Sequence, residues 1–296
     1  KRYRKISGGN SQMKIRIGTR KSALALAQTK LVENALKAAF PEIKTEIVHI
    51  TTKGDKILDK PLDVIGGKGV FIAEIERALT ENEIDIAVHS AKDLPLELAE
   101  GTHIGAVPER ADPADVLVMR RGDSIADVMT VGTGSLRRRN AFNSIFAGRV
   151  FNDIRGNVDT RLKKLENGEY DGIILAAAGL ERLGLRSSKR FSYMEFEPEF
   201  FVPAPCQGII AVQSRIGETD ELLAAINHPE TFLCFQTERE VLRLLDAGCT
   251  TPVGAYARRS GERLTLTITL DSMSLVTCEC TDDNYKKLVR EAVGSL

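Results

Sequence analysis

Positive charge is concentrated in one stretch of the sequence, between residues 137 and 163. This stretch holds seven basic residues against two acids, Asp153 and Asp159. The basic residues are Arg137, Arg138, Arg139, Arg149, Arg155, Arg161 and Lys163. The basic residues in 132–138 and in 154–157 directly follow expected strands. The N–H groups of the turn after a strand and the N-terminus of the next helix favour the binding of anions. Arginine adds a planar fork that matches carboxylate or phosphate in two bonds.

A solvated basic face is the alternative for a bare arginine triplet. Because the arginines recur at two strand exits, the pattern favours a polyanion site. The spacing leaves open whether phosphates or carboxylates bind there.

A second candidate group follows the strands expected near the N-terminus. Arg20 comes after the first of these strands, and Asp93 lies just past a buried strand in the run HSAKDLP. A carboxylate facing an arginine-rich cleft can stabilise a cationic intermediate or transfer a proton. Capping the turn before Pro95 is an equally good role for Asp93. His89 is expected to be a hydrogen-bonded core histidine.

Among the five cysteines, Cys249 differs because it follows a glycine in an expected turn between a helix and a strand. Chemistry alone leaves two roles open for it, an unreactive thiol or an attachment site. Cys278 and Cys280 share one face of an expected strand, and no further metal ligands have suitable spacing. The odd number of cysteines and the lack of an export signal predict reduced thiols in a cytoplasmic protein.

The composition excludes several classes of protein. The 296 residues suit about two domains. The 41 basic and 41 acidic residues sum to zero net charge, which argues against general binding to nucleic acid or to an anionic membrane. No stretch is apolar enough for a membrane helix. Residues 1–12 are polar and basic, and we expect them to be a leader or a cloning remnant.

Short β-rich runs alternate with amphipathic helical stretches through most of the chain, which indicates an α/β protein with mostly parallel sheets. Strands are expected at 14–18, 45–50, 84–88, 116–119, 129–132, 150–154, 172–177 and 209–213. Helices are expected at 22–40, 71–79, 135–146, 158–166, 221–227 and 231–245, with Ser22 and Ser135 as N-caps. The α/β pattern occurs twice, which predicts two similar lobes with a cleft between them. Strands at 253–257, 264–270 and 275–280 and a last helix from about residue 283 predict a small α+β domain.

Nine motifs in order resemble the porphobilinogen deaminase (hydroxymethylbilane synthase) family, from residue 15 to the last helix. They are IGTRKS, TTKGD, GGKGVF, AVHSAKDLP, GTGSLRRR, IRGNVDTRL, ILAAAGLERLGL, QGIIAV and AGCTTPVGAYA. The resemblance implies two periplasmic-binding-protein-like lobes and a small C-terminal domain. It places the first lobe at 13–112 and 203–226, the second at 113–202 and the C-terminal domain at 227–296.

The resemblance also implies an activity. Such enzymes join four porphobilinogen molecules head to tail with loss of ammonia, and water then releases the linear tetrapyrrole hydroxymethylbilane. A dipyrromethane cofactor is carried on a cysteine thioether, here Cys249. The catalytic aspartate corresponds to Asp93, which would stabilise the positive pyrrole nitrogen formed when ammonia leaves.

The other matching residues would bind the carboxylates of the cofactor and of the substrate. For the cofactor they are Lys92, Ser90, Ser22, Thr133, Ser135, Arg137, Arg138 and Arg161. For the substrate they are Arg20, Arg155, Ser22 and Gln207. Asp55 and Lys68 would belong to a flexible lid. The family further implies a cytoplasmic monomer that uses no metal.

Three features depart from the family pattern. Cys206 stands before Gln207 where many relatives have Val-Gly. We expect it to be a packing residue, and a second thiol near the site is the alternative. Gly134 replaces a common serine, which removes one hydroxyl donor. The C-terminal domain is short, which suits either a compact version or a piece of a longer fused chain.

A non-catalytic anion receptor or effector-sensing domain is the rival interpretation, since two α/β lobes with an arginine-lined cleft describe it as well. The missing export signal and the lack of a helix-turn-helix module count against it. Cys249 discriminates between the two, because a receptor does not need it.

Overall fold

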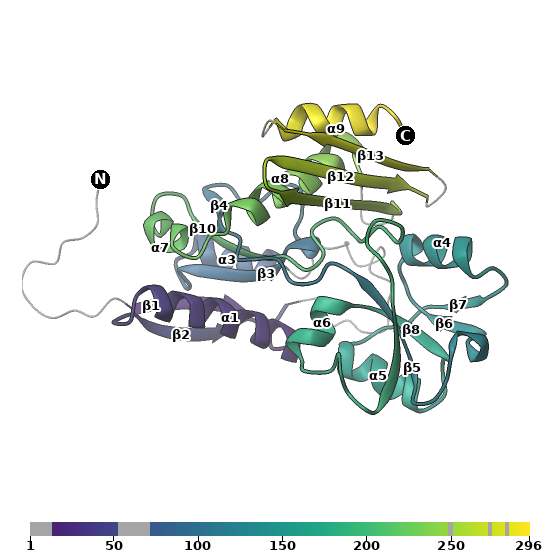
Figure 1. Ribbon diagram of the computed structural model, residues 1–296. Helices are drawn as coiled ribbons and strands as arrows, with labels where there is room; N and C mark the ends of the chain where they lie inside the picture. The colour runs from purple at the N-terminus through teal and green to yellow at the C-terminus, as the bar shows by residue number, and fades with distance from the viewer. Residues whose placement is uncertain (1–13, 53–71, 248–250, 272–273, 282–283) are drawn as a thin grey trace, which may run out of the picture. The chain divides into compact units, whose positions relative to one another are not determined.

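The computed structural model describes residues 14–52, 72–247, 251–271, 274–281 and 284–296. They form two compact units. The first contains the described residues of 1–109 together with 210–229, and the second contains those of 110–209 and 230–296. Figure 1 labels their helices and strands. Within this part of the chain, no helix is long and apolar enough to cross a membrane.

The first unit is built around one five-stranded sheet with the strand order β2-β1-β3-β10-β4. Strands β2, β1 and β3 are parallel, whereas β10 runs antiparallel to its neighbours β3 and β4. The elements are β1 (Lys14–Thr19), α1 (Ala23–Ala39), β2 (Lys44–His49), α3 (Ala73–Thr80), β3 (Ile86–Ser90), the 3-10 turn η2 (Ala91–Asp93), β4 (Thr102–Ala106), β10 (Ile210–Arg215) and α7 (Asp220–Ala224). A strand from late in the chain thus completes the sheet.

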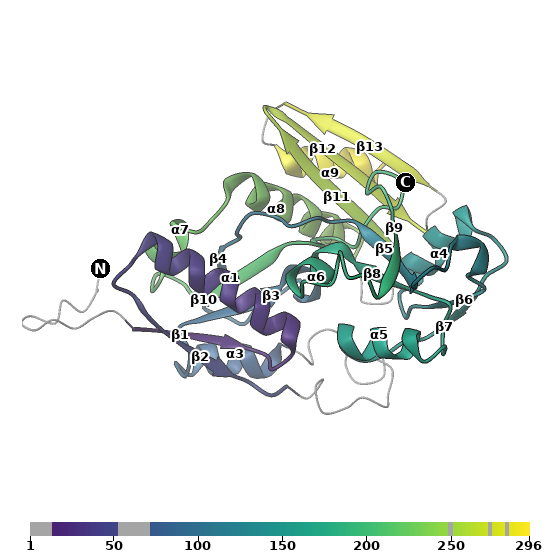
Figure 2. The ribbon, with the colours of Figure 1, turned by 60° about the horizontal axis from the view of Figure 1, so that its bottom comes forward.

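Helices cover both faces of this sheet, and strand β3 shows why. Successive side chains of a strand point to opposite faces. Ile86 and Val88 therefore pack in one cluster with Val32 and Leu36 of α1, and Ala87 packs in another with residues of α3. The two helices can be followed in Figure 2. Each aliphatic side chain buried completely in this way contributes about 2 kcal/mol.

The buried face of α1 differs in one respect from the sequence prediction. The helical spacing of Leu24, Leu31, Ala35 and Leu36 predicts an apolar face for this helix, but Leu31 is 50% exposed, whereas Val32 is completely buried. Polar Gln28 and Glu33 also lie on the buried face. The buried face of α1 is therefore rotated by about one residue from the predicted face. The prediction used apolar residues alone, whereas part of the buried face is polar.

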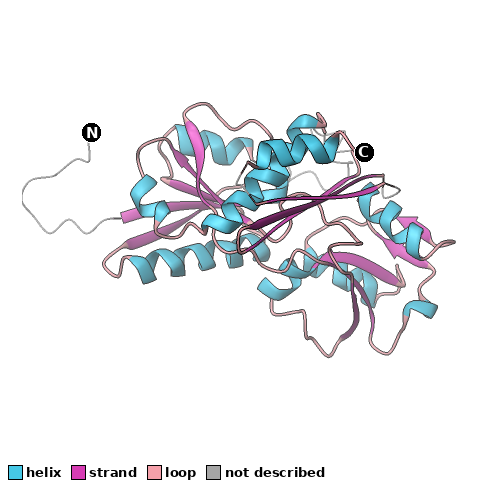
Figure 3. Cartoon of the chain, turned by 45° about the horizontal axis from the view of Figure 1, so that its top comes forward, coloured by secondary structure: helices cyan, strands magenta, loops and turns pink. Residues whose placement is uncertain are grey.

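The second unit contains a sheet of the same design, with the order β7-β6-β8-β5-β9. Strands β6, β7 and β8 are parallel, and β5 runs antiparallel to β8 and β9. The elements are β5 (Asp115–Arg120), η3 (Ile125–Asp127), β6 (Thr130–Gly132), α4 (Leu136–Ile145), β7 (Val150–Asn152), α5 (Val158–Glu166), β8 (Gly172–Ala176), α6 (Ala177–Arg182) and β9 (Phe191–Glu195). Their alternation along the chain can be followed in Figure 3.

Alternating side chains again bury both faces of the sheet. Val116 and Val118 pack with α5 and α6, and Leu117 and Met119 pack with α4 and three phenylalanines. Phe142 of α4 lies at the centre of that second cluster, with edge-to-face contacts to two other rings. The sheet is therefore fixed from both sides, and the loops at its carboxyl edge start from rigid strands.

A small antiparallel sheet, β11-β12-β13, completes the second unit. Its elements are α8 (Pro229–Leu244), β11 (Val253–Ser260), β12 (Arg263–Leu270), β13 (Leu275–Cys280) and α9 (Tyr285–Val293). Side chains of α8 and α9 pack in one cluster with this sheet, and α9 lies beside it (Figure 1). Cys234, Cys278 and Cys280 belong to the same cluster, so these thiols are packing residues.

A buried ion pair connects this small sheet to the chain before β5. The Arg110 guanidinium donates to both carboxylate oxygens of Glu238 on α8, at 2.6 and 3.3 Å, and to the Gln207 carbonyl at 2.9 Å. Glu238 also accepts the backbone N–H groups of Cys206 and Ala257. Every charge is matched, which a buried ion pair requires.

The expected fold class is confirmed: an α/β protein with two sheets rich in parallel strands and a small α+β domain. Ser22 and Ser135 cap α1 and α4 as predicted. Strands β4 and β9 and helix α6 were not expected. The domain boundaries given by the resemblance remain a prediction.

Candidate active site

In the first unit, five of the predicted residues lie at one edge of the sheet. Strands β1 and β3 are parallel neighbours, with Ile17 paired to Ile86, so the chain leaves both strands at the same edge. The residues that follow them there are Arg20, Ser22, Ser90, Lys92 and Asp93. Ser22 accepts the Ala25 N–H at 3.3 Å and so begins α1 at this edge.

Gln28 connects the two strand ends. Its side-chain amide donates to the Ser90 hydroxyl at 2.9 Å and its carbonyl lies 3.1 Å from the same oxygen. Gln28 is buried within α1, so it holds the turn after β3 against the helix after β1. The sequence analysis did not identify Gln28. A polar side chain on the core-facing side of an apolar helix could have indicated it, because such a side chain requires a buried hydrogen-bond partner.

Asp93 ends the 3-10 turn η2 and is partly exposed. This turn has no side-chain cap hydrogen bond. Across the described residues, no hydrogen bond or ion pair of the Asp93 carboxylate is found, so the capping role receives no support. A carboxylate in this position can interact with a cation that arrives with a ligand.

His89 lies four residues before Asp93, on β3, and is buried. Its Nε2 lies 3.1 Å from the Gln213 side-chain oxygen. Gln213 donates its own amide to Glu76 at 2.9 Å and to Thr102 at 2.8 Å. Because that amide group is used, Nε2 of His89 carries the proton and donates. Burial lowers the pKa of His89 to about 4, against the opposing effects of Gln213 and Asp93. This is the neutral core histidine that the sequence predicts.

The second unit presents a matching edge with basic residues. Val131 of β6 is paired in parallel with Phe151 of β7 and with Gly172 of β8, so the three strands end on one side. The predicted residues that follow them are Thr133, Ser135, Arg137, Arg138, Arg155 and Arg161. The Thr133 hydroxyl accepts the Ser135 N–H at 3.2 Å, which fixes the turn before α4.

Arg137 and Arg138 are nearly completely buried and share one carboxylate, that of Asp115. Arg137 reaches Oδ2 at 2.7 Å, and Arg138 reaches Oδ1 through Nε at 3.0 Å and Nη2 at 2.7 Å. The Gln207 amide donates to the same Oδ1 at 2.9 Å. Arg137 also donates to the Val202 carbonyl.

This cluster carries more positive than negative charge. Burial alone would raise the pKa of Asp115, but Arg137 and Arg138 hold that pKa far below its usual range. Desolvation lowers the pKa of Arg137, and Arg138 adds to this effect. Two guanidinium groups and one carboxylate leave a surplus of one positive charge. Direct ligand binding by Arg137, Arg138 and the completely buried Gln207 remains a prediction, and their observed contacts are internal.

For Arg155 and Arg182 of this unit, no carboxylate partner is found among the described residues. Arg155 is partly exposed, and no hydrogen bond or ion pair of its side chain is found in the part of the chain that the structure describes. Arg182, at the end of α6, donates to the Gly208 carbonyl at 2.6 Å. Its Nε is buried and finds no partner within the described residues, and desolvation lowers its pKa to about 10.

The sequence reading did not single out Arg182 as a site residue. It lies within the run ILAAAGLERLGL, which carried the resemblance. A buried donor without a partner is costly unless a ligand or water supplies an acceptor.

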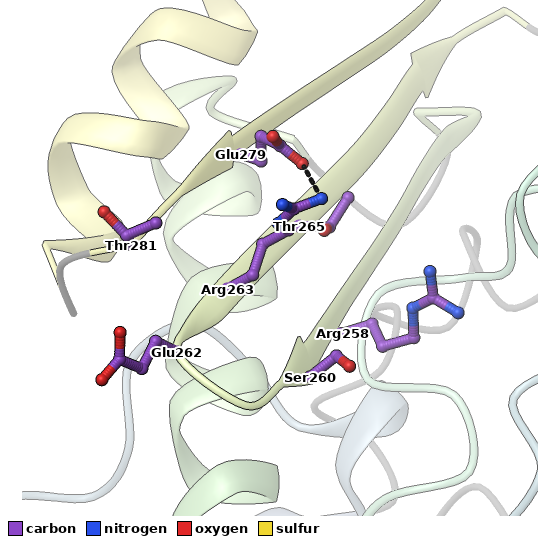
Figure 4. A pocket seen from close by; sticks show the side chains of 7 residues that line it. All are labelled: Arg258, Ser260, Glu262, Arg263, Thr265, Glu279 and Thr281. Atoms are coloured by element: carbon purple, nitrogen blue, oxygen red, sulfur yellow. Dashed lines mark ion pairs between the residues drawn. The ribbon is translucent and has the colours of Figure 1, made fainter.

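A hollow of about 620 Å³ on the small sheet does not form a comparable site (Figure 4). Side chains of both signs line it, and Arg263 pairs with Glu279 at 3.5 Å. These side chains are more than half exposed. Charges that offset each other in solvent give no preference for an anion or a cation.

Two family models match nearly the whole chain. The model described as porphobilinogen deaminase, dipyromethane cofactor binding domain, matches residues 15–223, and the model of the porphobilinogen deaminase C-terminal domain matches residues 232–291. The chain belongs to the porphobilinogen deaminase family. The resemblance on which the sequence reading relied is confirmed.

Curated members of the porphobilinogen deaminase family agree over most of the chain. A porphobilinogen deaminase of Alkaliphilus metalliredigens is 46% identical over 86% of this chain and 81% of its own length. One of Syntrophobacter fumaroxidans is 46% identical over 85% and 82%. Among solved structures, the periplasmic aliphatic sulphonate binding protein SsuA from Escherichia coli has a TM-score of 0.43 and 13% identity, covering 80% of this chain and 71% of its own. Values this low carry no information on ligand or activity.

Three residues that the porphobilinogen deaminase family pattern singles out, Asp55, Lys68 and Cys249, lie outside the described residues. Of the other four cysteines, Cys206 and Cys234 are buried. Cys278 and Cys280 pack against the core of the small domain. None of these four is a good candidate for attaching a cofactor, and Cys249 stays the predicted position.

The neutral, buried His89 should make the protein less stable in mild acid. Unfolded histidine takes up a proton below its ordinary pKa of 6.5, whereas the folded one stays neutral down to about 4. The contribution of His89 to the free energy of unfolding is therefore fully present above about pH 6.5 and is lost as the pH falls toward 4. We expect a loss of about 2 kcal/mol between about pH 7 and pH 5 from this group.

The measurement is urea unfolding followed by circular dichroism at both pH values, on the wild type and on His89→Gln. The difference between the two pH values should shrink by about that amount in the variant. An unchanged pH difference would show that His89 does not titrate on unfolding.

Arg138 and Arg155 should differ in their effect on stability. Arg138→Leu leaves Asp115 with one guanidinium instead of two and removes a donor to the Ile174 carbonyl. We expect it to lower the free energy of unfolding by about 3 kcal/mol or more. Arg155→Leu breaks no observed contact and should change it by less than about 0.5 kcal/mol. Equal losses in denaturant titrations of the two variants would contradict this assignment.

Proposed function

We propose that this chain is a hydroxymethylbilane synthase. It joins four porphobilinogen molecules head to tail, releases ammonia at each step and hydrolyses the linear tetrapyrrole hydroxymethylbilane from the enzyme. The observation that carries the proposal is the match of the family's cofactor binding domain to residues 15–223. The chemistry of the two sheet edges is consistent with it.

A dipyrromethane fits the residues at hand. It is made from two porphobilinogen units, so it carries two acetates and two propionates. The second unit has a surplus positive charge around Asp115, an arginine without an observed partner at Arg155 and a buried orphan donor on Arg182. Carboxylates are the acceptors that such guanidinium groups bind in two bonds. Cys249 would hold the group through a thioether.

The roles of the chain's residues follow from their surroundings. Asp93, whose carboxylate has no internal partner among the described residues, stabilises the positive pyrrole nitrogen that porphobilinogen acquires when ammonia leaves. Arg20, Arg155, Arg161 and Arg182 bind acetates and propionates, so that the reacting carbons are held in place. The cofactor, when bound, supplies the pyrrole carbon to which the first substrate is joined.

Further donors at the two edges come from Ser22, Ser90, Lys92, Thr133 and Ser135. Arg137 and Arg138 supply positive charge from the interior of the second unit, where Gln207 donates to the same Asp115 carboxylate. Asp55 and Lys68 would close over the ligand. The domains are proposed to be 13–112 with 203–226, 113–202, and 227–296. We also propose that the enzyme acts as a monomer in the cytoplasm and that it binds no nucleic acid.

Intact mass spectrometry and turnover of porphobilinogen test the proposal together. The purified protein should carry an adduct of one dipyrromethane, which Cys249→Ser abolishes and Cys278→Ser retains. Asp93→Asn should keep the adduct and the fold while turnover falls about 100-fold or more, because the variant no longer offers a negative charge. Glu97→Gln, an exposed carboxylate four residues later, is the control and should leave turnover unchanged.

Active wild-type protein without an adduct would overturn the cofactor assignment. Normal turnover by Asp93→Asn would remove Asp93 from the reaction. A protein that binds porphobilinogen but never consumes it would support the rival interpretation as an anion receptor.

A further inference from the structure

One acid lies among the basic groups at the edge of the second unit. Asp153 follows β7 directly and precedes Arg155 by two residues. Its side chain is 72% exposed. A Cβ atom placed on Gly134 would lie 3.7 Å from Oδ1 of Asp153. The Asp153 carboxylate therefore lies beside the turn of Thr133–Ser135, where the proposed function places ligand carboxylates.

Arg139 holds this carboxylate in place. Its Nη2 donates to Oδ1 of Asp153. Nε and Nη2 of the same guanidinium donate to the Thr133 carbonyl at 3.1 and 3.0 Å. The Thr133 N–H in turn donates to the Asn152 carbonyl at 2.9 Å, which joins the two strand ends. Arg139 thus interacts with the turn on one side and with Asp153 on the other.

The charges decide what this arrangement does. Arg139 is 27% exposed at an edge that otherwise attracts anions. Asp153 offsets the charge of Arg139 and places its own negative charge beside the donors of the turn. A substrate carboxylate that binds at Thr133 and Ser135 is attracted by Arg139 and repelled by Asp153. These effects nearly cancel, whereas Arg155 has no observed carboxylate partner to offset it.

We propose that Asp153 competes with substrate carboxylates for Arg139 and so lowers the affinity of the turn at Thr133–Ser135. The inference rests on the proposed function. It predicts that the negative charge of Asp153 weakens porphobilinogen binding and that the positive charge of Arg139 strengthens it. A purely structural ion pair would give a different result, because removing either partner would then loosen the turn and weaken binding.

The test is a set of variants of the holoenzyme assayed with porphobilinogen. Asp153→Asn should lower KM about two- to fivefold at low ionic strength. Arg139→Gln should raise KM by a similar factor. The double variant should return KM to within about twofold of the wild type, because both charges are removed together. All differences should shrink at about 0.5 M salt.

Glu166→Gln is the matched control. Glu166 forms another exposed pair of this unit, with Arg190 at 2.6 Å, at the far end of α5 from its start near Arg155. It should leave KM unchanged. Thermal unfolding of each variant is measured alongside, and Asp153→Asn should keep the wild-type midpoint within a few degrees, as expected of an exposed pair.

The outcomes separate the two proposals. Turnover by the wild type with an unchanged or higher KM in Asp153→Asn would overturn the role of Asp153 and leave the function standing. A raised KM in all three variants with a lowered unfolding midpoint would show that the pair only supports the turn. A wild type that does not consume porphobilinogen would overturn both.

Discussion

The second unit depends on the buried carboxylate of Asp115 more than on any other group. Two guanidinium groups of α4 and the amide of Gln207 converge on it. The same arginines donate to the carbonyls of Val202 and Ile174. One carboxylate therefore connects β5, α4, β8 and the segment that carries Gln207. A buried charge without partners costs several kcal/mol. Replacing any one member of this set therefore also destabilises the charged groups that remain.

The first unit fixes its edge without buried charge at the strand ends. Gln28 ties Ser90 to α1, and Gln213 ties the neutral His89 to α3 and β4. The contact between Gln28 and Ser90 is neutral, whereas Gln213 donates to the carboxylate of Glu76. Asp93 lies four residues after the neutral His89 and directly after Lys92, and no hydrogen bond or ion pair of its carboxylate is found within the described residues. The edge of the first unit thus differs in charge from that of the second unit, where arginines predominate.

Local sequence predicted the features that depend on local interactions. Both serine caps follow from their position before an amphipathic run, and α5 has the predicted bounds. The motifs were sufficient to identify the family, and the site residues that they indicate stay a prediction. Burial of Arg137 and Arg138 could not be predicted in this way, because it depends on Asp115, about twenty residues away in the sequence and at the start of another strand. The same holds for β10, whose place between β3 and β4 is set by long-range pairing. On α1, the apolar Leu31 is exposed and the polar Gln28 is buried. Burial of Gln28 depends on its hydrogen bond to Ser90, which is distant in the sequence.

A comparison of each arginine with its carboxylate partners separates structural arginines from candidates for binding. Arg110 has a carboxylate of its own in Glu238, and Arg186 is bound by Asp112 and Glu195, which raise its pKa above the usual range. The charges of Arg110 and Arg186 are thus neutralised by carboxylates of the chain itself. The Arg182 guanidinium reaches only a carbonyl in the observed contacts, and its pKa is lowered by desolvation. Bringing a carboxylate to it would restore the charge balance and satisfy its buried donor. The zero net charge of the whole chain conceals this difference, because it counts charges without asking which of them are already paired.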